Sequence, residues 1–177
     1  MENPRKEIMS WILYFLCIFL AVYVIITFVG QRTSVNGDSM ETTLSDGDNL
    51  IMDKLTYRIR DPKRFEVIIF PCPTKPEVYY IKRVIGLPGE TVQIINGAVY
   101  IDGELLETDI YGATKMGQAG LAYEPITIGE DEYFVLGDNR MISKDSRSDA
   151  VGLIKRDSIE GRALLCVYPF EKFGFVK

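Results

Sequence analysis

Residues 91–103 have the sequence TVQIINGAVYIDG, and this stretch decides the fold class. Apolar residues alternate with others on both sides of Asn96-Gly97, as they do along β-strands that have one buried face. Asn-Gly between two such runs is a strong signal for a type I′ turn, and Asp102-Gly103 marks a second turn just after it. The sequence therefore predicts an antiparallel β-hairpin here.

Short apolar runs separated by turn residues continue on both sides of this hairpin. The predicted strands are residues 49–52, 67–70, 78–85, 91–95, 98–101, 132–136 and 163–168. Residues 112–122 are rich in Gly and Ala and are predicted to form a flexible excursion. The expected fold class is all-β, with a barrel-like or sandwich domain over residues 30–177.

An apolar segment of a different kind precedes this domain. Residues 8–29 contain no charge and no proline, and as a helix they would span about 33 Å, the thickness of a hydrocarbon core. A cleaved signal peptide would have a shorter apolar region that ends in small residues, which this segment does not. We therefore predict a transmembrane anchor at residues 8–29. Arg5 and Lys6 favour cytoplasmic residues 1–7 and an extracytoplasmic domain.

The composition excludes several kinds of chemistry. The 177 residues include no histidine, which removes Ser-His-Asp triads, Cys-His dyads and His-ligated zinc sites. The net charge of −5 argues against nucleic-acid binding. Three cysteines are too few for a disulfide scaffold, although Cys72 and Cys166 could pair. We expect no metal and no cofactor.

Two adjacent cations lie in the predicted strand 78–85. Neighbouring strand residues point to opposite faces, so Lys82 shares a face with Tyr80 and Val84, whereas Arg83 lies on the other face and should tolerate replacement by lysine. On an edge strand, both cations would reach water. A buried Lys82 would instead have a lowered pKa and could act as a neutral general base. The strand alone leaves both interpretations open.

A general base requires a nucleophile. Ser39, in the polar segment Gly37-Asp38-Ser39-Met40, follows the predicted anchor by ten residues, but a serine in such a turn can also be purely structural. A second polar segment, GDNRMISKDSR at residues 137–147, directly follows an apolar run. Its plain interpretation is a solvated loop with local Asx turns.

Taken together, these segments resemble the bacterial type I signal peptidases of the Ser-Lys kind. The matching pieces occur in the order typical of that family: the N-terminal anchor, then residues 37–40, 64–70, 80–89, 137–147 and 152–162. The lysine segment and the GDNR segment in this order are highly specific. The resemblance therefore extends along nearly the whole chain.

The resemblance implies a membrane-anchored serine endopeptidase that removes N-terminal signal peptides from exported preproteins. It implies that Ser39 is the nucleophile and Lys82 the general base. Some relatives have a hydroxyl side chain at the position of Gly37 that stabilises the oxyanion. This chain has glycine there instead, as the compact Gram-positive-like members do. The second oxyanion donor therefore stays unassigned.

The same resemblance implies supporting roles for four further residues. Ser143 would help to orient the lysine, Asp145 and Arg147 would pair to hold their loop, and Met40 would line the substrate cleft. Thr42 stands where the family usually has proline, so the rigid turn behind the nucleophile is not assured.

Two alternatives stay open. The chain could be a related Ser-Lys maturation protease with a specialised substrate, or an inactive membrane-tethered β module that binds a partner. Such a module would not need Ser39 and Lys82 together. For the peptidase, the expected partners are secretory preproteins and membrane lipid, and the expected location is the cell membrane, with a single pass. The sequence does not predict an oligomeric state.

Overall fold

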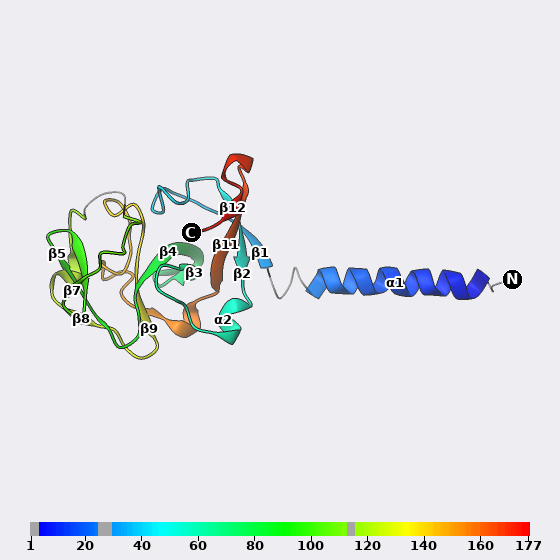
Figure 1. Cartoon of the computed structure of the whole chain (residues 1–177), viewed down its shortest axis with the longest axis horizontal. Coiled ribbons are helices and arrows are strands. Elements are labelled where there is room, and N and C mark those ends of the chain that lie inside the picture. The colour runs from blue at the N-terminus through cyan, green and yellow to red at the C-terminus, as the bar shows by residue number, and fades with distance from the viewer. Residues whose placement is uncertain (1–3, 25–29, 113–115) are drawn as a thin grey trace.

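The computed structural model describes residues 4–24, 30–112 and 116–177. A long N-terminal helix, α1 (Pro4–Val24), extends away from a β-rich body that contains most of the chain (Figure 1). The elements that follow, with η for 3₁₀ helices, are β1 (Gly30–Ser34), β2 (Asn49–Asp53), α2 (Thr56–Ile59), β3 (Val67–Cys72), β4 (Lys75–Gly86), β5 (Thr91–Ile95), β6 (Ala98–Ile101), β7 (Glu104–Leu105), η2 (Gly120–Tyr123), β8 (Ile126–Thr127), β9 (Glu132–Leu136), β10 (Ile154–Lys155), η3 (Arg156–Ser158), β11 (Gly161–Tyr168), η4 (Phe170–Lys172) and β12 (Gly174–Phe175). The expectation of a mostly-β domain is confirmed.

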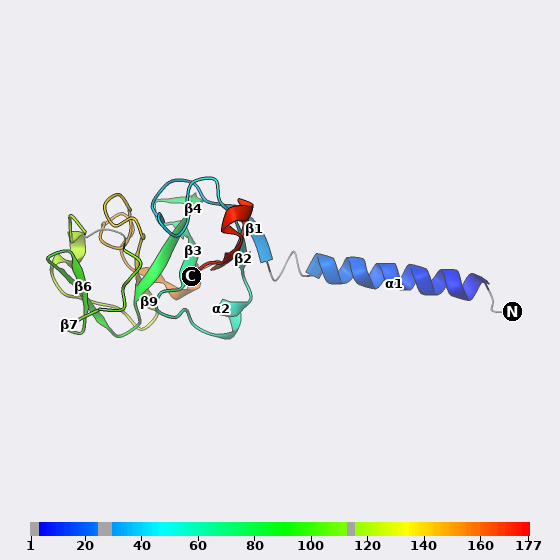
Figure 2. The ribbon, with the colours of Figure 1, turned by 45° about the horizontal axis from the view of Figure 1, so that its top comes forward.

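The strands form two antiparallel sheets. The larger sheet has the order β1-β2-β11-β3-β4-β9-β10, with β12 paired to β11, and the smaller has the order β7-β6-β5-β8. Neither order returns to its first strand, so the described strands form open sheets and not a closed barrel. Figures 1 and 2 show the smaller sheet at the end of the body that lies farthest from α1.

Each of the seven predicted strands lies within an observed one. The hairpin of β5 and β6 is confirmed, with Ile95 paired to Ala98 and positive φ angles of 51° and 78° at Asn96 and Gly97. Both angles suit the type I′ turn that Asn-Gly favours. The strands that the sequence pattern missed are β1 and the two-residue strands β7, β8, β10 and β12. Short strands carry too few residues for alternation to be recognised.

The N-terminal helix carries many exposed apolar side chains, among them Trp11, Phe15 and Phe19. Within the described part of the chain, no helix combines the length and the hydropathy needed to cross a membrane. Residues 25–29 of the predicted anchor lie outside the described residues.

Strand β4 lies inside the larger sheet, between β3 and β9, and connects the main parts of the core. Val84 belongs to a cluster with Phe70 and Tyr133, whereas Ile85 belongs to a second cluster that includes the inner face of the smaller sheet. These clusters cover the two faces of β4, and Lys82 and Arg83 are only 3% and 0% exposed, although β9 pairs with β4 only from Arg83 onward. The edge-strand interpretation of Lys82 and Arg83 is therefore wrong.

The structure can be compared with two further predictions, one for residues 112–122 and one for Cys72 and Cys166. The excursion predicted at residues 112–122 is anchored by Met116 and Ala122, which are buried in the core of the smaller sheet, whereas residues 117, 118, 120 and 121 are exposed. Residues 113–115 lie outside the described residues. Cys72 and Cys166 are both buried and free, so they do not form the disulfide that the sequence left open.

Candidate active site

The turn that carries Ser39 is fixed by its own backbone and by two buried side chains. The backbone N–H groups of Thr43 and Leu44 donate to the Met40 carbonyl oxygen, each at 2.8 Å. Met40 and Leu44 are almost fully buried in the core cluster between β2 and β11. Gly37 has a φ of 89°, which a residue with a side chain rarely adopts, and its N–H donates to Asp46. Ser39 is thus presented by a turn that is anchored at both ends.

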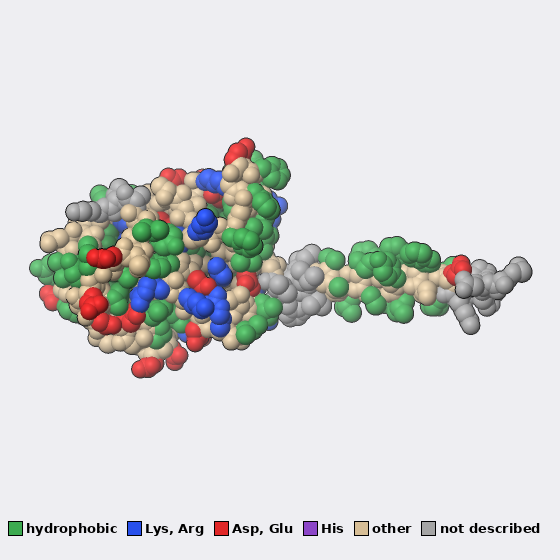
Figure 3. Space-filling view, viewed as in Figure 1, with side chains coloured by type: hydrophobic (Ala, Val, Ile, Leu, Met, Phe, Trp, Pro, Cys, Tyr) green, Lys and Arg blue, Asp and Glu red, His purple; other side chains and the backbone are tan. Residues whose placement is uncertain are grey.

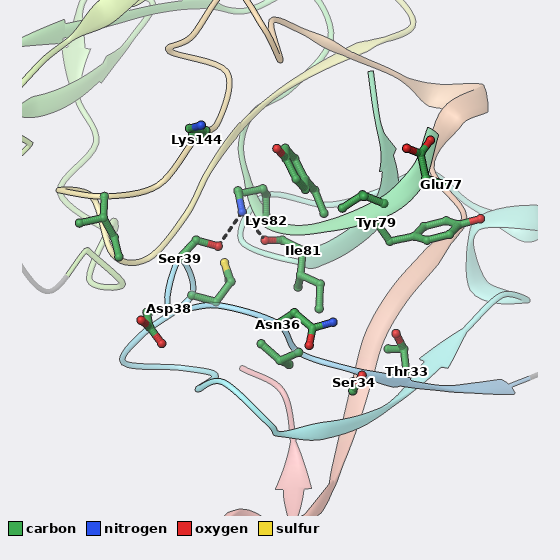
Figure 4. Close-up of a pocket in the computed structure, with 15 residues that line it drawn as sticks. Thr33, Ser34, Asn36, Asp38, Ser39, Glu77, Tyr79, Ile81, Lys82 and Lys144 are labelled. Atoms are coloured by element: carbon green, nitrogen blue, oxygen red, sulfur yellow. Dashed lines mark hydrogen bonds between the residues drawn. The ribbon is translucent and has the colours of Figure 1, made fainter. Parts of the chain in front are cut away.

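Lys82 reaches the Ser39 hydroxyl from the middle of β4. Its Nζ atom lies 2.7 Å from Ser39 Oγ and donates to the Ile81 carbonyl oxygen at 2.9 Å. The Tyr80 ring lies under the amine, with its centroid 5.1 Å from Nζ. The residue is 3% exposed. Figure 4 shows Ser39 and Lys82 pointing toward one another across the cleft.

Burial changes the acidity of this lysine. Loss of hydration lowers the pKa of Lys82 to about 8, because water no longer stabilises the charged amine. Asp145 and Asp138 oppose this change, since their negative charges favour the ammonium form. Desolvation prevails, so a useful fraction of the amine is neutral at pH values only slightly above neutrality.

The loop of residues 137–147 packs directly behind Ser39. The Asn139 N–H donates to the Ser39 carbonyl oxygen at 3.1 Å. Gly137 permits this approach, because a Cβ atom there would lie 2.4 Å from that carbonyl oxygen and 2.2 Å from Ser143 Oγ. Ser143 Oγ is buried and forms no hydrogen bond with any described residue, Lys82 included. The structure therefore brings Ser143 beside the nucleophile without a direct contact to the amine.

Asp145 and Arg147 form a bidentate ion pair within this loop. Two guanidinium nitrogens of Arg147 donate to the two Asp145 carboxylate oxygens, each at 2.8 Å. Asp145 also accepts a hydrogen bond from the Gly137 N–H at 3.1 Å. Through Asp145, the ion pair and this hydrogen bond connect Gly137 at the beginning of the loop to Arg147 at its end.

Arg83, the neighbour of Lys82, is completely buried on the opposite face of β4. Its guanidinium donates to both carboxylate oxygens of Asp138, at 2.8 and 2.6 Å, and to the Phe65 carbonyl oxygen at 2.7 Å. The Tyr111 ring stacks on it, with the centroid 3.7 Å from Cζ. Thr43 donates to the same carboxylate at 2.5 Å. Arg83 faces away from Ser39, as expected, but this many contacts make a harmless replacement by lysine physically implausible.

Sequence reasoning missed several members of this network. Asp138 lies in the polar segment that was singled out, yet nothing in the sequence relates it to Arg83. Tyr111 lies in a segment with no motif, as does Asp109, whose carboxylate forms a bidentate pair with Arg140 at 2.7 Å. These partners are distant in sequence and meet only because the smaller sheet packs against the loop that supports Ser39.

A cleft of about 540 Å³ opens above Ser39 and Lys82. One wall is the end of β1 with the following residues, and the other is the exposed first half of β4 (Figure 4). Met40 is among the lining residues although it is only 1% exposed, so it contributes little surface to the cleft. The cleft exposes backbone on two sides, as a site for an extended peptide would.

Comparison with known proteins identifies the family of the chain. The family model described as signal peptidase, peptidase S26, matches residues 8–168. The chain is 37% identical over 156 residues to a probable signal peptidase I-2 of Synechocystis sp., covering 85% of this chain and 68% of the relative. It is 31% identical over 180 residues to a signal peptidase I of Bacillus licheniformis, covering 96% of this chain and 94% of the relative. A solved signal peptidase I from Enterococcus faecalis V583 is 37% identical, with a TM-score of 0.49, and covers 59% of this chain and 97% of that structure. The family model and the two relatives confirm the resemblance to type I signal peptidases, and the chain belongs to the signal peptidase family, peptidase S26.

Proposed function

We propose that this chain removes N-terminal signal peptides from exported preproteins as a serine endopeptidase, with Ser39 as the nucleophile and Lys82 as the general base. The observation that carries the assignment is the 2.7 Å separation of Ser39 Oγ and Lys82 Nζ at the floor of the cleft. A nucleophile within hydrogen-bonding distance of a desolvated amine is the arrangement that hydroxyl activation requires.

The reaction follows from this pair. Neutral Lys82 accepts the Ser39 proton while Ser39 Oγ attacks the scissile carbonyl carbon, and the carbonyl oxygen becomes an oxyanion. The ammonium of Lys82 then gives the proton to the leaving amine, and an ester of Ser39 remains. Water attacks this ester, with Lys82 again accepting a proton, and the signal peptide is released as a carboxylic acid. The ammonium of Lys82 gives this proton to the departing Ser39 Oγ, so the serine and the lysine both return to their starting states.

Backbone N–H groups near Ser39 stabilise the oxyanion in this mechanism. The Ser39 N–H is a suitable donor, because it has no hydrogen-bond acceptor among the described residues. Ser143 supports the dyad from behind, Asp145 and Arg147 hold the loop, and Met40 packs beneath the lining of the cleft. These roles rest on the family resemblance together with the distances given above.

We further propose the membrane topology that the sequence predicts: residues 1–7 in the cytoplasm, 8–29 in the bilayer and 30–177 outside. The exposed apolar side chains of α1 support it. Hydrophobic side chains also gather on the edge of the body nearest to α1 (Figure 3), and η4 and β12 lie on that side of the body (Figure 1). Phe170, Phe173 and Phe175, in and beside these elements, are 78%, 63% and 72% exposed. Such aromatic side chains suit contact with membrane lipid.

The topology can be tested by extraction and proteolysis. The full chain should stay with membranes in alkaline carbonate, and added protease should digest the domain only from the outer side. Release by carbonate, or protection of the domain from outside, would contradict the topology without affecting the catalytic assignment.

The catalytic proposal is tested by incubating the full chain, in detergent, with a secretory precursor and locating the new N-terminus by mass spectrometry. Cleavage should follow small residues at the first and third positions before the scissile bond. Ser39→Ala should abolish cleavage while the fold remains, because the side chain is small and partly exposed. Near-normal activity of Ser39→Ala, or efficient processing of a precursor with bulky residues at both positions, would refute the proposal.

A further inference from the structure

A second hollow of about 550 Å³ lies next to the cleft above Ser39. It is lined by the 117–120 segment and by residues of the 137–147 loop with the adjoining Ser148. Lys144 lines both hollows, so the two meet at its side chain. Figure 4 shows Lys144 above Ser39 and apart from Thr33, Tyr79 and Glu77, which lie together at the β1 end of the cleft.

The position of the second hollow indicates which part of a substrate would reach it. Strand β1 is the first element of the body after α1, and the 117–120 segment belongs to the end that carries the smaller sheet, farthest from α1 (Figure 1). A signal peptide is apolar and precedes the scissile bond. With the membrane on the α1 side, as in the topology proposed above, the residues before the bond lie along β1. The first residues of the mature protein then leave past Lys144.

The second hollow is lined by more cations than anions. Its charged residues are Arg140, Lys144, Asp145 and Arg147. Asp145 is paired with Arg147, and Arg140 is paired with Asp109. Lys144 is exposed and forms no ion pair with any residue that the structure describes, so its charge is available to a ligand.

The cleft above Ser39 differs in charge. Asp38 and Glu77 line it, and neither lines the second hollow. Figure 4 shows Glu77 at the β1 end of the cleft, whereas Asp38 lies on the same side of Ser39 as Lys144. A substrate that crosses Ser39 therefore passes from the end with the Glu77 carboxylate to a hollow whose unpaired charge is that of Lys144. This difference predicts a different preference on the two sides of the scissile bond.

We propose that the second hollow receives the first residues of the mature protein, and that Lys144 makes the enzyme favour acidic side chains there. The inference rests on the proposed function and adds to it a specificity that depends on one exposed residue. This specificity concerns the mature protein and not the signal peptide.

The test uses the full chain in detergent and three synthetic peptides that span a cleavage site. The peptides share small residues at the first and third positions before the bond and differ only in the two residues after it, which are Asp-Asp, Asn-Asn or Lys-Lys. We expect kcat/KM to be about threefold higher for Asp-Asp than for Asn-Asn, and lowest for Lys-Lys, as exposed ion pairs are modest in strength. The preference should shrink in 1 M salt, where charges are screened within about 3 Å.

Variants assign the preference to one side chain. Lys144→Gln should bring the Asp-Asp to Asn-Asn ratio close to one, and Lys144→Glu should reverse it. Ratios between substrates are used because a change in charge near Lys82 alters all three rates together. Lys155→Glu is the matched control, since Lys155 is exposed but lines neither hollow, and it should keep the wild-type ratio.

The outcomes separate the two proposals. Equal cleavage of the three peptides by the wild type, or an unchanged ratio in Lys144→Glu, would overturn the specificity while leaving the peptidase assignment intact. A reversed ratio in Lys155→Glu would also overturn it, because the preference would then reflect net charge alone. If the wild type cleaves none of the peptides and no precursor, the proposed function fails and the specificity fails with it.

Discussion

The two faces of strand β4 each bury one cation, and they stabilise it in opposite ways. Arg83 meets a carboxylate in bidentate contact, a backbone carbonyl and an aromatic ring. One residue earlier, Lys82 meets the Ser39 hydroxyl, the Ile81 carbonyl oxygen and the Tyr80 ring. No carboxylate within the described residues forms an ion pair with it.

This difference follows the chemistry of the two side chains. A guanidinium does not lose its proton in proteins, so a buried arginine must be paired with negative charge. An amine can respond to burial by releasing its proton. The face with the carboxylate holds the site together, whereas the face without one provides a base.

The largest effect is expected when Lys82 is replaced by arginine, so that both faces of β4 bury a guanidinium. Lys82→Arg keeps the positive charge but cannot accept a proton, so turnover should fall at least about 1000-fold. Cleavage of a precursor, followed by mass spectrometry, measures this loss. Lys82→Met is the matched control: it should be equally inactive and no less stable, because it removes a buried amine. A Lys82→Arg protein that still processes the precursor would mean that the amine has only a structural role.

The opposite face should respond in stability. Asp138→Asn would leave the Arg83 charge buried without its carboxylate, and the free energy of unfolding should fall by about 3 to 5 kcal/mol. Arg83→Lys should lower it less, since Asp138 keeps a cation but loses the bidentate contact and the Tyr111 stacking. Denaturant unfolding followed by far-ultraviolet circular dichroism measures the free energy of unfolding of both variants. Wild-type stability of Asp138→Asn would show that the network does not hold the site.

The two faces should also differ in how pH affects stability. Lys82 loses its proton near pH 8 in the folded chain and near pH 10.4 when unfolded, so between these values the unfolded state binds more protons. Stability therefore rises with pH across this window, by about 3 kcal/mol. Lys82→Met should lack this rise, and unfolding curves of both proteins at pH 7 and pH 10 compare them. The same rise in both proteins would assign it to other groups.

The smallest effect is expected for Ser143, which lies behind the dyad without a hydrogen bond to it. Ser143→Ala should lower turnover by about tenfold or less, because one hydrogen bond formed during the reaction typically contributes about 0.5 to 1.5 kcal/mol. The initial rate of precursor cleavage measures this. Full wild-type activity would remove the orienting role that the family resemblance implies.

Much of the sheet could be predicted from the sequence because local signals determine it. Alternation located β5 and β6 with their observed bounds, a short apolar run located β9, and Asn96-Gly97 located the hairpin. The position of β4 inside the larger sheet could not be predicted, because pairing with β3 and β9 depends on contacts between distant segments. That position decides whether a cation on the strand reaches water.

The candidate site also contains residues that the sequence indicates and residues that it does not. Ser39, Lys82, Asp145 and Arg147 lie in segments whose residue pattern resembles the family, and that resemblance also implies that the last two pair. Tyr111 gave no signal, since a tyrosine in a loop is common and its use depends on the docking of the smaller sheet. Contacts between sheets, and the side chains that line hollows between loops, are the part that sequence patterns do not contain.

The central claim is that burial without a carboxylate makes Lys82 a base, and the pH dependence of kcat/KM tests it most directly. With a short soluble peptide as substrate, kcat/KM reports the ionisation of the free enzyme, which is the state described here. Protonated Lys82 cannot accept the Ser39 proton, so kcat/KM should be low in acid and rise with pH through an apparent pKa near 8. A rise centred near 10.4, the pKa of an ordinary lysine, or no rise between pH 6 and 10, would contradict the account.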